Sequence, residues 1–413
     1  MTYQSQSNGL VAFKAQSALG STASGGSGFV LRTAGGPGGK ITKNVYESNE
    51  VRRDLMRARG RHGLRKTSGS YTCELSLDNC DAFFEAVFRG TWEAALVKTE
   101  ADNSLTSIVT DSSGTITAGG GSWITAGFRV GDVVRLTNHA TAANNGRNMR
   151  ITALTATVMT VAMLDGGSLT TNAVADTAFT MTRPGQKLIN PAAGSAVKTY
   201  FTIEEYDGDL DLTEIFSDCI ITSLKFSMSA GGLIMVDISW VGTGQFTTAS
   251  AGSAPTFTSP TESTGLPLSA VDAVVRYSST DFVDLTSWDL SIDIGGVAPE
   301  VIGSVVSPDV FTGQMGVSMN FSMLRSDYGK MTDFLAETAL TFQMVAAENE
   351  SEPKDFLSLF VPNFTLGGVD KSALSKEAGP RTQTIQVPVG LVGKDTTGGA
   401  YDATMIKLQV SNT

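Results

Sequence analysis

The chain has 413 residues and a formal net charge of −11, with 30 Lys and Arg against 41 Asp and Glu. This length exceeds a typical single core, so we expect about two or three domains. The acidic balance argues against tight binding of duplex DNA, because that affinity comes mainly from basic side chains on phosphates. The 44 glycines, beside many Ser, Thr and Val residues, favour a mainly β fold with many turns.

Three further features narrow the class of protein. Cys73, Cys80 and Cys219 include no C-x-x-C pair, so we expect free thiols in apolar surroundings. The first residues, MTYQSQSNGLVAFK, lack the cationic start and apolar core of a secretory signal. No uninterrupted apolar run reaches the ~18 residues that a membrane span needs, so no membrane partner is expected.

The first domain is expected to begin with a long polar arm. Residues 18–40 are rich in Gly and Ser, which predicts a flexible segment. A basic run follows at 52–66, and we place it in a loop spanning 34–69. Next, alternating apolar and polar residues predict a strand, and DNCDAFFEAVFRG predicts a short amphipathic helix capped by Asp78 or Asn79.

The composition changes between residues 101 and 186. Short strand-like segments are separated there by Gly, Asn and Asp turns at regular intervals. This spacing predicts a small inserted β-sandwich or barrel of its own. Trp123, Phe128 and Phe179 are the aromatic residues expected to support its modest core.

The first domain, residues 1–100 and 187–242, is expected to end with a β-hairpin. In the stretch IITSLKFSMSAGGLIMVDISWVG, apolar residues alternate with polar ones on both sides of Ala-Gly-Gly. A linker rich in Ser and Thr follows at 243–265, and a second domain at 266–413 repeats the layout. There, TSWDLSIDIG and GVSMNFSML predict strands, and SDYGKMTDFLAETALTF predicts a helix.

Two sequence matches suggest that the second domain duplicates the first. Leu75-Ser76-Leu77 resembles Phe321-Ser322-Met323 at an offset of 246 residues, and the stretch from Val236 to Gly242 resembles that from Val387 to Gly393 at an offset of 151. The difference of 95 residues must be extra material in the first half, and the proposed insert accounts for most of it.

No catalytic constellation is found in the sequence. His62 and His139 are the only histidines, so a His-dependent triad or a multi-His metal site is hard to build. GGPGGK at 35–40 fails as a phosphate loop, because Ala34 stands where the first Gly is required and Ile41 replaces Ser or Thr. We therefore expect neither enzyme activity nor a cofactor.

Acidic clusters are better interpreted as polar surface. DGDLD at 207–211 has the start of a calcium loop, but Leu212 occupies the position of the required Gly, and Asp218 that of the usual Glu. A solvated acidic turn is the simpler interpretation, and no metal site is expected. Asp289 and Asp293 lie four apart on one strand face, where they suit a polar lining in the absence of a predicted cleft.

Taken together, the order of elements resembles the major tail tube proteins of long-tailed bacteriophages. The resemblance rests on a long polar arm, a strand, a short helix, the TYFTIEE strand at 199–205 and a hairpin that ends in WVG at 240–242. It covers about 320 residues, everything except the insert. The insert itself resembles β-domains that decorate the outside of some such tubes.

The resemblance implies a structural virion protein whose stacked rings form a hollow tail tube for DNA ejection. It implies two tandem β-sandwich or barrel domains of the tube type, each with a short flanking helix, plus the inserted β-domain. The implied partners are further copies of the chain, other tail proteins at the tube ends and DNA that passes without specific binding. Assembly is expected in the host cytoplasm. If the duplication holds, three chains form a ring with pseudo-six-fold symmetry, and a hexameric ring is the alternative.

Two sets of surface residues follow from the resemblance. Polar residues that alternate with the apolar ones are expected to face the lumen: Lys225, Ser227, Asp237, Ser239, Asp289, Ser291, Asp293, Ser318, Asn320 and Ser322. The basic run is expected to meet acidic residues of the adjacent ring. The expected inter-ring contacts are Arg52, Arg53, Arg57, Arg59, Arg61, Arg65 and Lys66 with Asp207, Asp209, Asp211 and Glu214.

Other classes stay open at this point. A carbohydrate-binding module or adhesin would also be β-rich and acidic, and a stable monomer that binds glycans would favour it. A hydrolase on a β scaffold would need clustered carboxylates in a pocket. A capsid-decorating protein is a further alternative, which stacked rings would exclude. The basic run also has two alternative interpretations, as a solvated loop or as a DNA contact.

Overall fold

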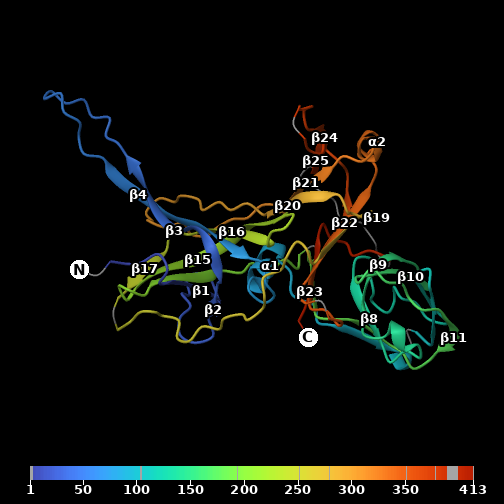
Figure 1. Cartoon of the computed structure of the whole chain (residues 1–413). Helices are drawn as coiled ribbons and strands as arrows, with labels where there is room; N and C mark the ends of the chain where they lie inside the picture. Colours follow the sequence, from blue (N-terminus) through green and yellow to red (C-terminus); the bar gives the residue numbers. More distant parts are fainter. Residues whose placement is uncertain are drawn as a thin grey trace.

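The computed structural model describes residues 3–102, 105–192, 194–250, 252–278, 280–349, 351–376, 378–387 and 399–412. These residues form three antiparallel sheets, of 12, eight and six strands, with two short α-helices (Figure 1). The mainly β fold that the composition predicts is confirmed. The sheets are layered, with the six-stranded sheet between the 12-stranded sheet and the eight-stranded one.

The 12-stranded sheet contains a continuous run of eight strands, which we call the wall sheet. Their order is β3-β4-β16-β15-β20-β21-β25-β24. Their bounds are Thr33–Tyr46, Arg61–Glu74, Met235–Gly242, Leu212–Ser229, Leu285–Asp293, Gly316–Leu324, Thr382–Val387 and Gly368–Lys371, respectively. The first half of β15 leaves the wall sheet to pair with β14 (Phe201–Asp207) and β17 (Phe246–Ala249). Beyond β14 lie β1 (Gly9–Ala15) and β2 (Phe29–Val30).

The six-stranded sheet packs beneath the second half of the wall sheet. Its order is β13-β26-β23-β22-β18-β19, with bounds Gln186–Ile189, Lys407–Ser411, Phe356–Phe364, Leu340–Ala347, Ala273–Tyr277 and Thr280–Asp281. Phe342 of β22 stacks against both Trp288 and Phe321 of the wall sheet, with ring centroids 5.4 and 6.1 Å apart. Each such buried aromatic side chain stabilises the fold by about 1.5–3 kcal/mol.

The two predicted helices are present, each after a strand of the wall sheet. α1 (Asp81–Phe88) follows β4, and α2 (Gly329–Leu335) follows β21. α1 buries its Phe and Val side chains against the core because they recur at helical spacing. The predicted cap is wrong: the residue that precedes the helix is Cys80, which makes no side-chain capping bond. The Asn79 side chain instead accepts a hydrogen bond from the backbone of Arg32.

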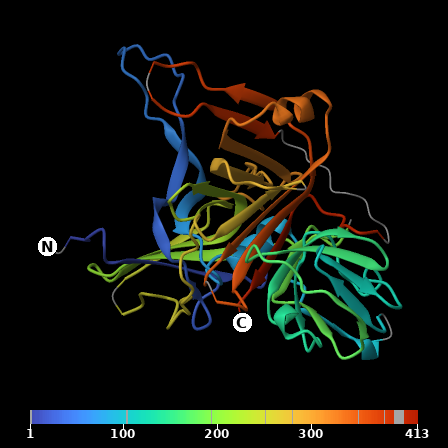
Figure 2. The ribbon, with the colours of Figure 1, turned by 45° about the vertical axis from the view of Figure 1, so that its right-hand side comes forward.

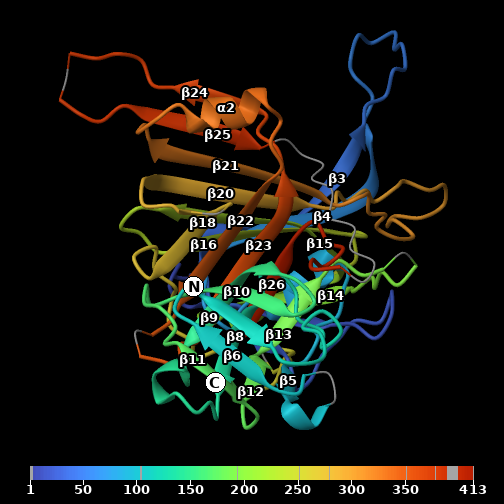
Figure 3. The same ribbon diagram turned by 90° about the vertical axis from the view of Figure 1, so that its right-hand side faces the viewer.

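The eight-stranded sheet is the insert. Its order is β11-β6-β7-β10-β9-β8-β12-β5, with bounds Asn172–Asp176, Ile108–Asp111, Thr115–Ala118, Val158–Met163, Asn148–Leu154, Val133–Thr137, Thr180–Arg183 and Leu96–Thr99. The sheet thus begins a few residues earlier than expected from composition. The three predicted core aromatics are fully buried, and Trp123 packs edge-on against Phe128. Figure 3 shows the insert beside the six-stranded sheet, away from β20 and β21.

The segment 34–69, expected as a loop, is instead mostly a long β-hairpin. β3 and β4 pair from Thr33↔Cys73 to Tyr46↔Arg61, and the hairpin projects beyond the rest of the sheet (Figures 1 and 2). Close packing requires glycine at several positions of this hairpin, among them Gly39. A Cβ on Gly39 would lie 2.5 Å from the ring of Phe216, so no larger residue fits there.

The expected linker at 243–265 is likewise packed on the first half of the chain. It contains β17, which pairs with β15, and Phe257 is 1% exposed. The sequence pattern misses this because the segment is held mainly by polar contacts to backbone groups. Of the repeat stretch at 387–393, only Val387 lies within the described residues.

Candidate functional surfaces

One face of the wall sheet is polar across four neighbouring strands. Every residue predicted to face a lumen lies on this face, on β15, β16, β20 or β21. The register aligns them in rows across the sheet: Lys225 is opposite both Asp237 and Ser291, and Ser291 is opposite Ser318. Directly opposed residues of antiparallel strands share a face, so the rows form one continuous surface.

The opposite face of the same strands is buried, which fixes the orientation of the polar one. The alternating residues Leu224, Phe226, Ile238, Leu290 and Met319 are all 0% exposed. A slip of one residue in any strand would bury a polar row and expose an apolar one. The register is therefore strongly determined by the core.

The polar face is acidic. Asp237, Asp289 and Asp293 lie on it together with one cation, Lys225. Asp237 accepts a hydrogen bond from Thr72 at 2.6 Å, and Asp289 accepts one from Asn320 at 3.1 Å. Neutral donors thus hold these two carboxylates in place on the polar face.

The first part of the basic run, residues 52–60, lies at the end of the β3–β4 hairpin, and Arg61, Arg65 and Lys66 lie on β4. Residues 47–60, which we call the tip, connect the two strands. Arg52 pairs with Asp54 at 2.7 Å and Arg57 with Glu47 at 3.5 Å, both within the tip. Lower on the hairpin, Lys66 pairs at 3.1 Å with Glu300 of the loop between β20 and β21. Exposed pairs of this kind contribute little to stability.

The predicted acidic residues lie around the turn between β14 and β15. Asp209 accepts hydrogen bonds from Ser5 and Asn8, which holds the N-terminal segment and lowers the pKa of that carboxyl. Burial, together with the charges of Glu205 and Asp207, raises the pKa of Glu214. Within one chain the structure records no ion pair between this turn and the tip residues.

Two carboxylates in the TYFTIEE strand, the buried Glu204 and the half-buried Glu205, were not singled out from the sequence. Glu204 is 1% exposed and accepts hydrogen bonds from Thr213, Thr256 and the backbone of Phe257. Glu205 accepts one from the backbone N–H of Gly39 at 2.6 Å. The first carboxylate holds the 243–265 segment, and the second holds the base of the hairpin. Paired acids inside an otherwise apolar strand were the available signal, because buried carboxylates require donors.

The insert is joined to the six-stranded sheet by buried polar contacts. Lys407 of β26 donates to Asp132 of the insert at 2.7 Å and to Asp402 at 3.0 Å. Burial opposes the charge of Lys407, but the two carboxylates outweigh it and raise its pKa. The Gln409 amide also bonds both the N–H and the C=O of Val133. The insert is thus fixed to the face of this sheet that points away from the wall sheet.

No group of His, Cys, Asp and Glu that could hold a metal ion occurs among the described residues. The three cysteines are free and buried, as the sequence predicts. In the described part of the chain, no helix is both long and apolar enough to cross a membrane.

Comparison with known families decides the identity. A family model described as phage tail tube protein matches residues 6–389, nearly the whole chain. The chain belongs to this family. A search among curated proteins finds no match to the chain.

Membership assigns this tail tube protein a structural role in the virion tail. The family is one of structural proteins and not of enzymes, in line with the absence of a catalytic constellation in the sequence. A tail tube protein assembles with copies of itself into a tube and contacts other tail proteins. The polar face and the projecting hairpin are therefore considered below as surfaces of an assembled wall.

Proposed function

We propose that the polar face of the wall sheet lines the lumen of the tail tube and that DNA passes along it during ejection. The single observation that supports this most is the continuity of the polar rows across strands from both halves of the chain. An acidic wall repels phosphate, so DNA can slide without being held. The insert, fixed two layers away, would decorate the outer surface.

The wall sheet also supports an internal duplication. Cys73 pairs with Val236, and Met319 pairs with Val387. Met319 lies 246 positions after Cys73, and Val387 lies 151 positions after Val236. These are the offsets of the two sequence matches. The strand order agrees, since β3-β4-β16-β15 corresponds to β20-β21-β25-β24, with α1 after β4 and α2 after β21. The insert lies between α1 and β14, where the second half has only a short connection.

We infer from this duplication that three chains form a ring with pseudo-six-fold symmetry. The two halves join through β15 and β20 within the chain. By correspondence, β24 of one chain would join β3 of the next, and each has a free edge among the described strands. Pro37 lies in β3, which suits an edge strand because proline cannot donate to a ladder. Closing the ring would leave no free edge in the wall sheet.

A labelling experiment tests the lumen assignment. Lys225 is exposed on the polar face, and Val174 is 76% exposed on the insert. In assembled tubes, Lys225→Cys should react with a small maleimide but not with one attached to a large polymer, whereas Val174→Cys should react with both. Both variants should react with both reagents before assembly. Equal reaction of Lys225→Cys with the large reagent in tubes would contradict the assignment.

We further propose that the basic hairpin takes part in the contact between stacked rings, with assembly in the host cytoplasm. Neutralising Arg57, Arg59 and Arg61 together by glutamine should block tube growth and leave the subunit folded. Tube yield by electron microscopy and the circular dichroism of the unassembled chain would measure the two effects. Tubes of normal length from this variant would contradict the proposed role of the hairpin.

A further inference from the structure

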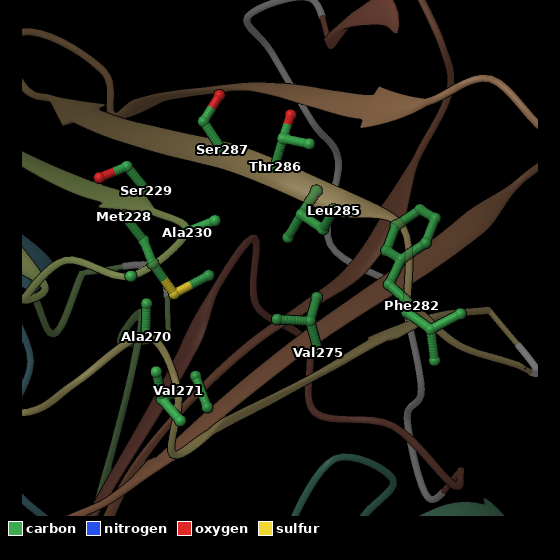
Figure 4. A pocket seen from close by; sticks show the side chains of 13 residues that line it. Met228, Ser229, Ala230, Ala270, Val271, Val275, Phe282, Leu285, Thr286 and Ser287 are labelled. Atoms are coloured by element: carbon green, nitrogen blue, oxygen red, sulfur yellow. The ribbon is translucent and has the colours of Figure 1, made fainter. Parts of the chain in front are cut away.

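An apolar pocket opens at one end of the wall sheet, beside the turn between β15 and β16. Its volume is about 270 Å³. Met228 and Val275 are nearly buried in it, at 8% and 6% exposed, whereas Val271 and Val283 on its rim are 78% and 89% exposed. Figure 4 shows side chains of β15, β18 and β20 converging on this space, with Leu285 among them.

The strand register places this pocket and the tip at opposite ends of the wall sheet. At the pocket end, Ser227 pairs with Met235, which pairs with Glu74, the last residue of β4. At the other end, Arg61, the first residue of β4, pairs with Tyr46 at the base of the tip. The 14 residues of β4 therefore separate the two features. A projection at one end and a recess at the other suit a head-to-tail contact, which produces stacks.

The tip carries the apolar side chains that such a recess would receive. Val51 and Leu55 are 97% and 95% exposed, and Met56 is 64% exposed. All three lie within a loop that projects beyond the sheet (Figure 2). Exposed apolar side chains grouped in this way mark a surface that a partner covers.

Charge complementarity selects the tip as the occupant of the pocket. Asp272 and Asp284 follow the two rim valines, and neither carboxylate has an ion pair in the described part of the chain. Arg53 and Arg59 of the tip likewise have none there. The alternative occupant is the loop at 294–315, which lies at the same end of the sheet as the tip. This loop contains two acidic residues and no Lys or Arg. An acidic rim therefore attracts the tip and disfavours this loop.

We propose that the tip of one chain docks into this pocket on a copy of the chain in the adjacent ring, with Leu55 as the central apolar contact. The inference rests on the proposed stacking of rings. It gives the basic tip an acceptor other than the acidic turn at 207–212. That turn precedes β15, which runs in the same direction as β4, so the turn lies at the same end of the sheet as the tip.

Crosslinking in assembled tubes tests the proposal directly. Leu55→Cys is combined with Val271→Cys or with Val283→Cys, and tubes are treated with a short bismaleimide. The natural cysteines are buried and give no background. A ladder of covalently linked chains on a denaturing gel is expected for these pairs. A third pair, Leu55→Cys with Leu210→Cys, tests the acidic turn. A ladder from the third pair alone, or no ladder from either pocket pair, would overturn the proposal.

An assembly measurement separates this proposal from tube formation itself. Val283→Lys places a positive charge on the rim, which opposes both the apolar contact and the attraction of the basic tip, and should raise the concentration needed for tube growth by about tenfold or more. Val174→Lys is the matched control on the insert and should change nothing. Tubes from Val283→Lys at the normal concentration would refute the docking alone. A wild-type chain that forms no tubes would refute the proposed function instead.

Discussion

The buried carboxylate of Glu204 offers a quantitative test of how the 243–265 segment is held. Each carboxylate oxygen accepts two hydrogen bonds. One oxygen is bonded by Thr213 at 2.8 Å and by the N–H of Thr256 at 2.6 Å. The other is bonded by the Thr256 hydroxyl at 2.7 Å and by the N–H of Phe257 at 3.0 Å. Each oxygen thus serves one hydroxyl and one backbone N–H.

Glu204→Gln replaces one of these oxygens with an NH₂ group. A hydroxyl can rotate to accept from that group, but a backbone N–H cannot. Whichever way the amide is oriented, one buried N–H loses its partner. An orphaned buried donor costs about 1–3 kcal/mol, and hydrogen bonds to the lost charge add to this, so we expect about 2–4 kcal/mol of destabilisation.

Urea unfolding of the unassembled chain, followed by tryptophan fluorescence, measures the change. Glu262→Gln is the control, because Glu262 is exposed in the same segment and should change stability by less than about 0.5 kcal/mol. Limited proteolysis should also cut the Glu204→Gln variant faster within 243–265. Equal stability of the two variants would refute the account of this carboxylate.

Three other predictions follow from the buried ion pair, the first helix and the polar face. Asp132→Ala leaves the Lys407 charge with fewer partners and should destabilise the chain by about 3 kcal/mol in urea unfolding, whereas an effect below 1 kcal/mol would contradict a buried pair. Burial and the charge of Asp78 raise the pKa of Asp81 to about 7, from 3.8, so this carboxyl destabilises the fold as the pH rises between these values. Asp81→Asn should therefore raise the free energy of unfolding at about pH 8, by up to about 1.4 kcal/mol for each pKa unit, and leave it unchanged at about pH 4. Thermal unfolding at the two pH values measures this, and a pH-independent effect would argue otherwise. Finally, Ser291→Arg with Ser318→Arg should make tubes retain short DNA duplexes on sedimentation at low salt, and unchanged retention would count against a lumen lined by these rows.

The polar face could be predicted from the sequence because successive side chains of a half-buried strand alternate between the core and the surface. Leu224 and Phe226 alternate with Ser223 and Lys225, and the core enforces that alternation in the fold. The first helix was readable for the same reason, at a period of 3.6 residues. Residues that pack into one core thus reveal their element.

The long hairpin and the packed 243–265 segment were not readable in this way. Position 39 requires glycine because the ring of Phe216, 177 positions later in the chain, fills the space that a side chain would need. Thr256 and Phe257 are held by Glu204, which lies 52 and 53 positions away. Such long-range contacts leave no local periodicity, so a residue such as Gly39 suggests flexibility in the sequence although its packing constrains it.

The pocket and the charges around it also could not be predicted from local sequence patterns. Val271 precedes β18 and Val283 follows β19, and the pocket between them is completed by Met228 of β15, which lies much earlier in the chain. Tip and pocket can be recognised as opposite ends of one sheet only from the register of β4, β16 and β15.

The count of chains in one ring of a tube tests the central claim most directly. Cryo-electron microscopy of tubes grown from the purified chain, with the mass of isolated rings, would give that count. We predict a hollow tube with three chains in each ring, the polar face of the wall sheet on the lumen and the insert outside. Rings of six chains, or an assembly with the polar face turned away from the lumen, would contradict the account.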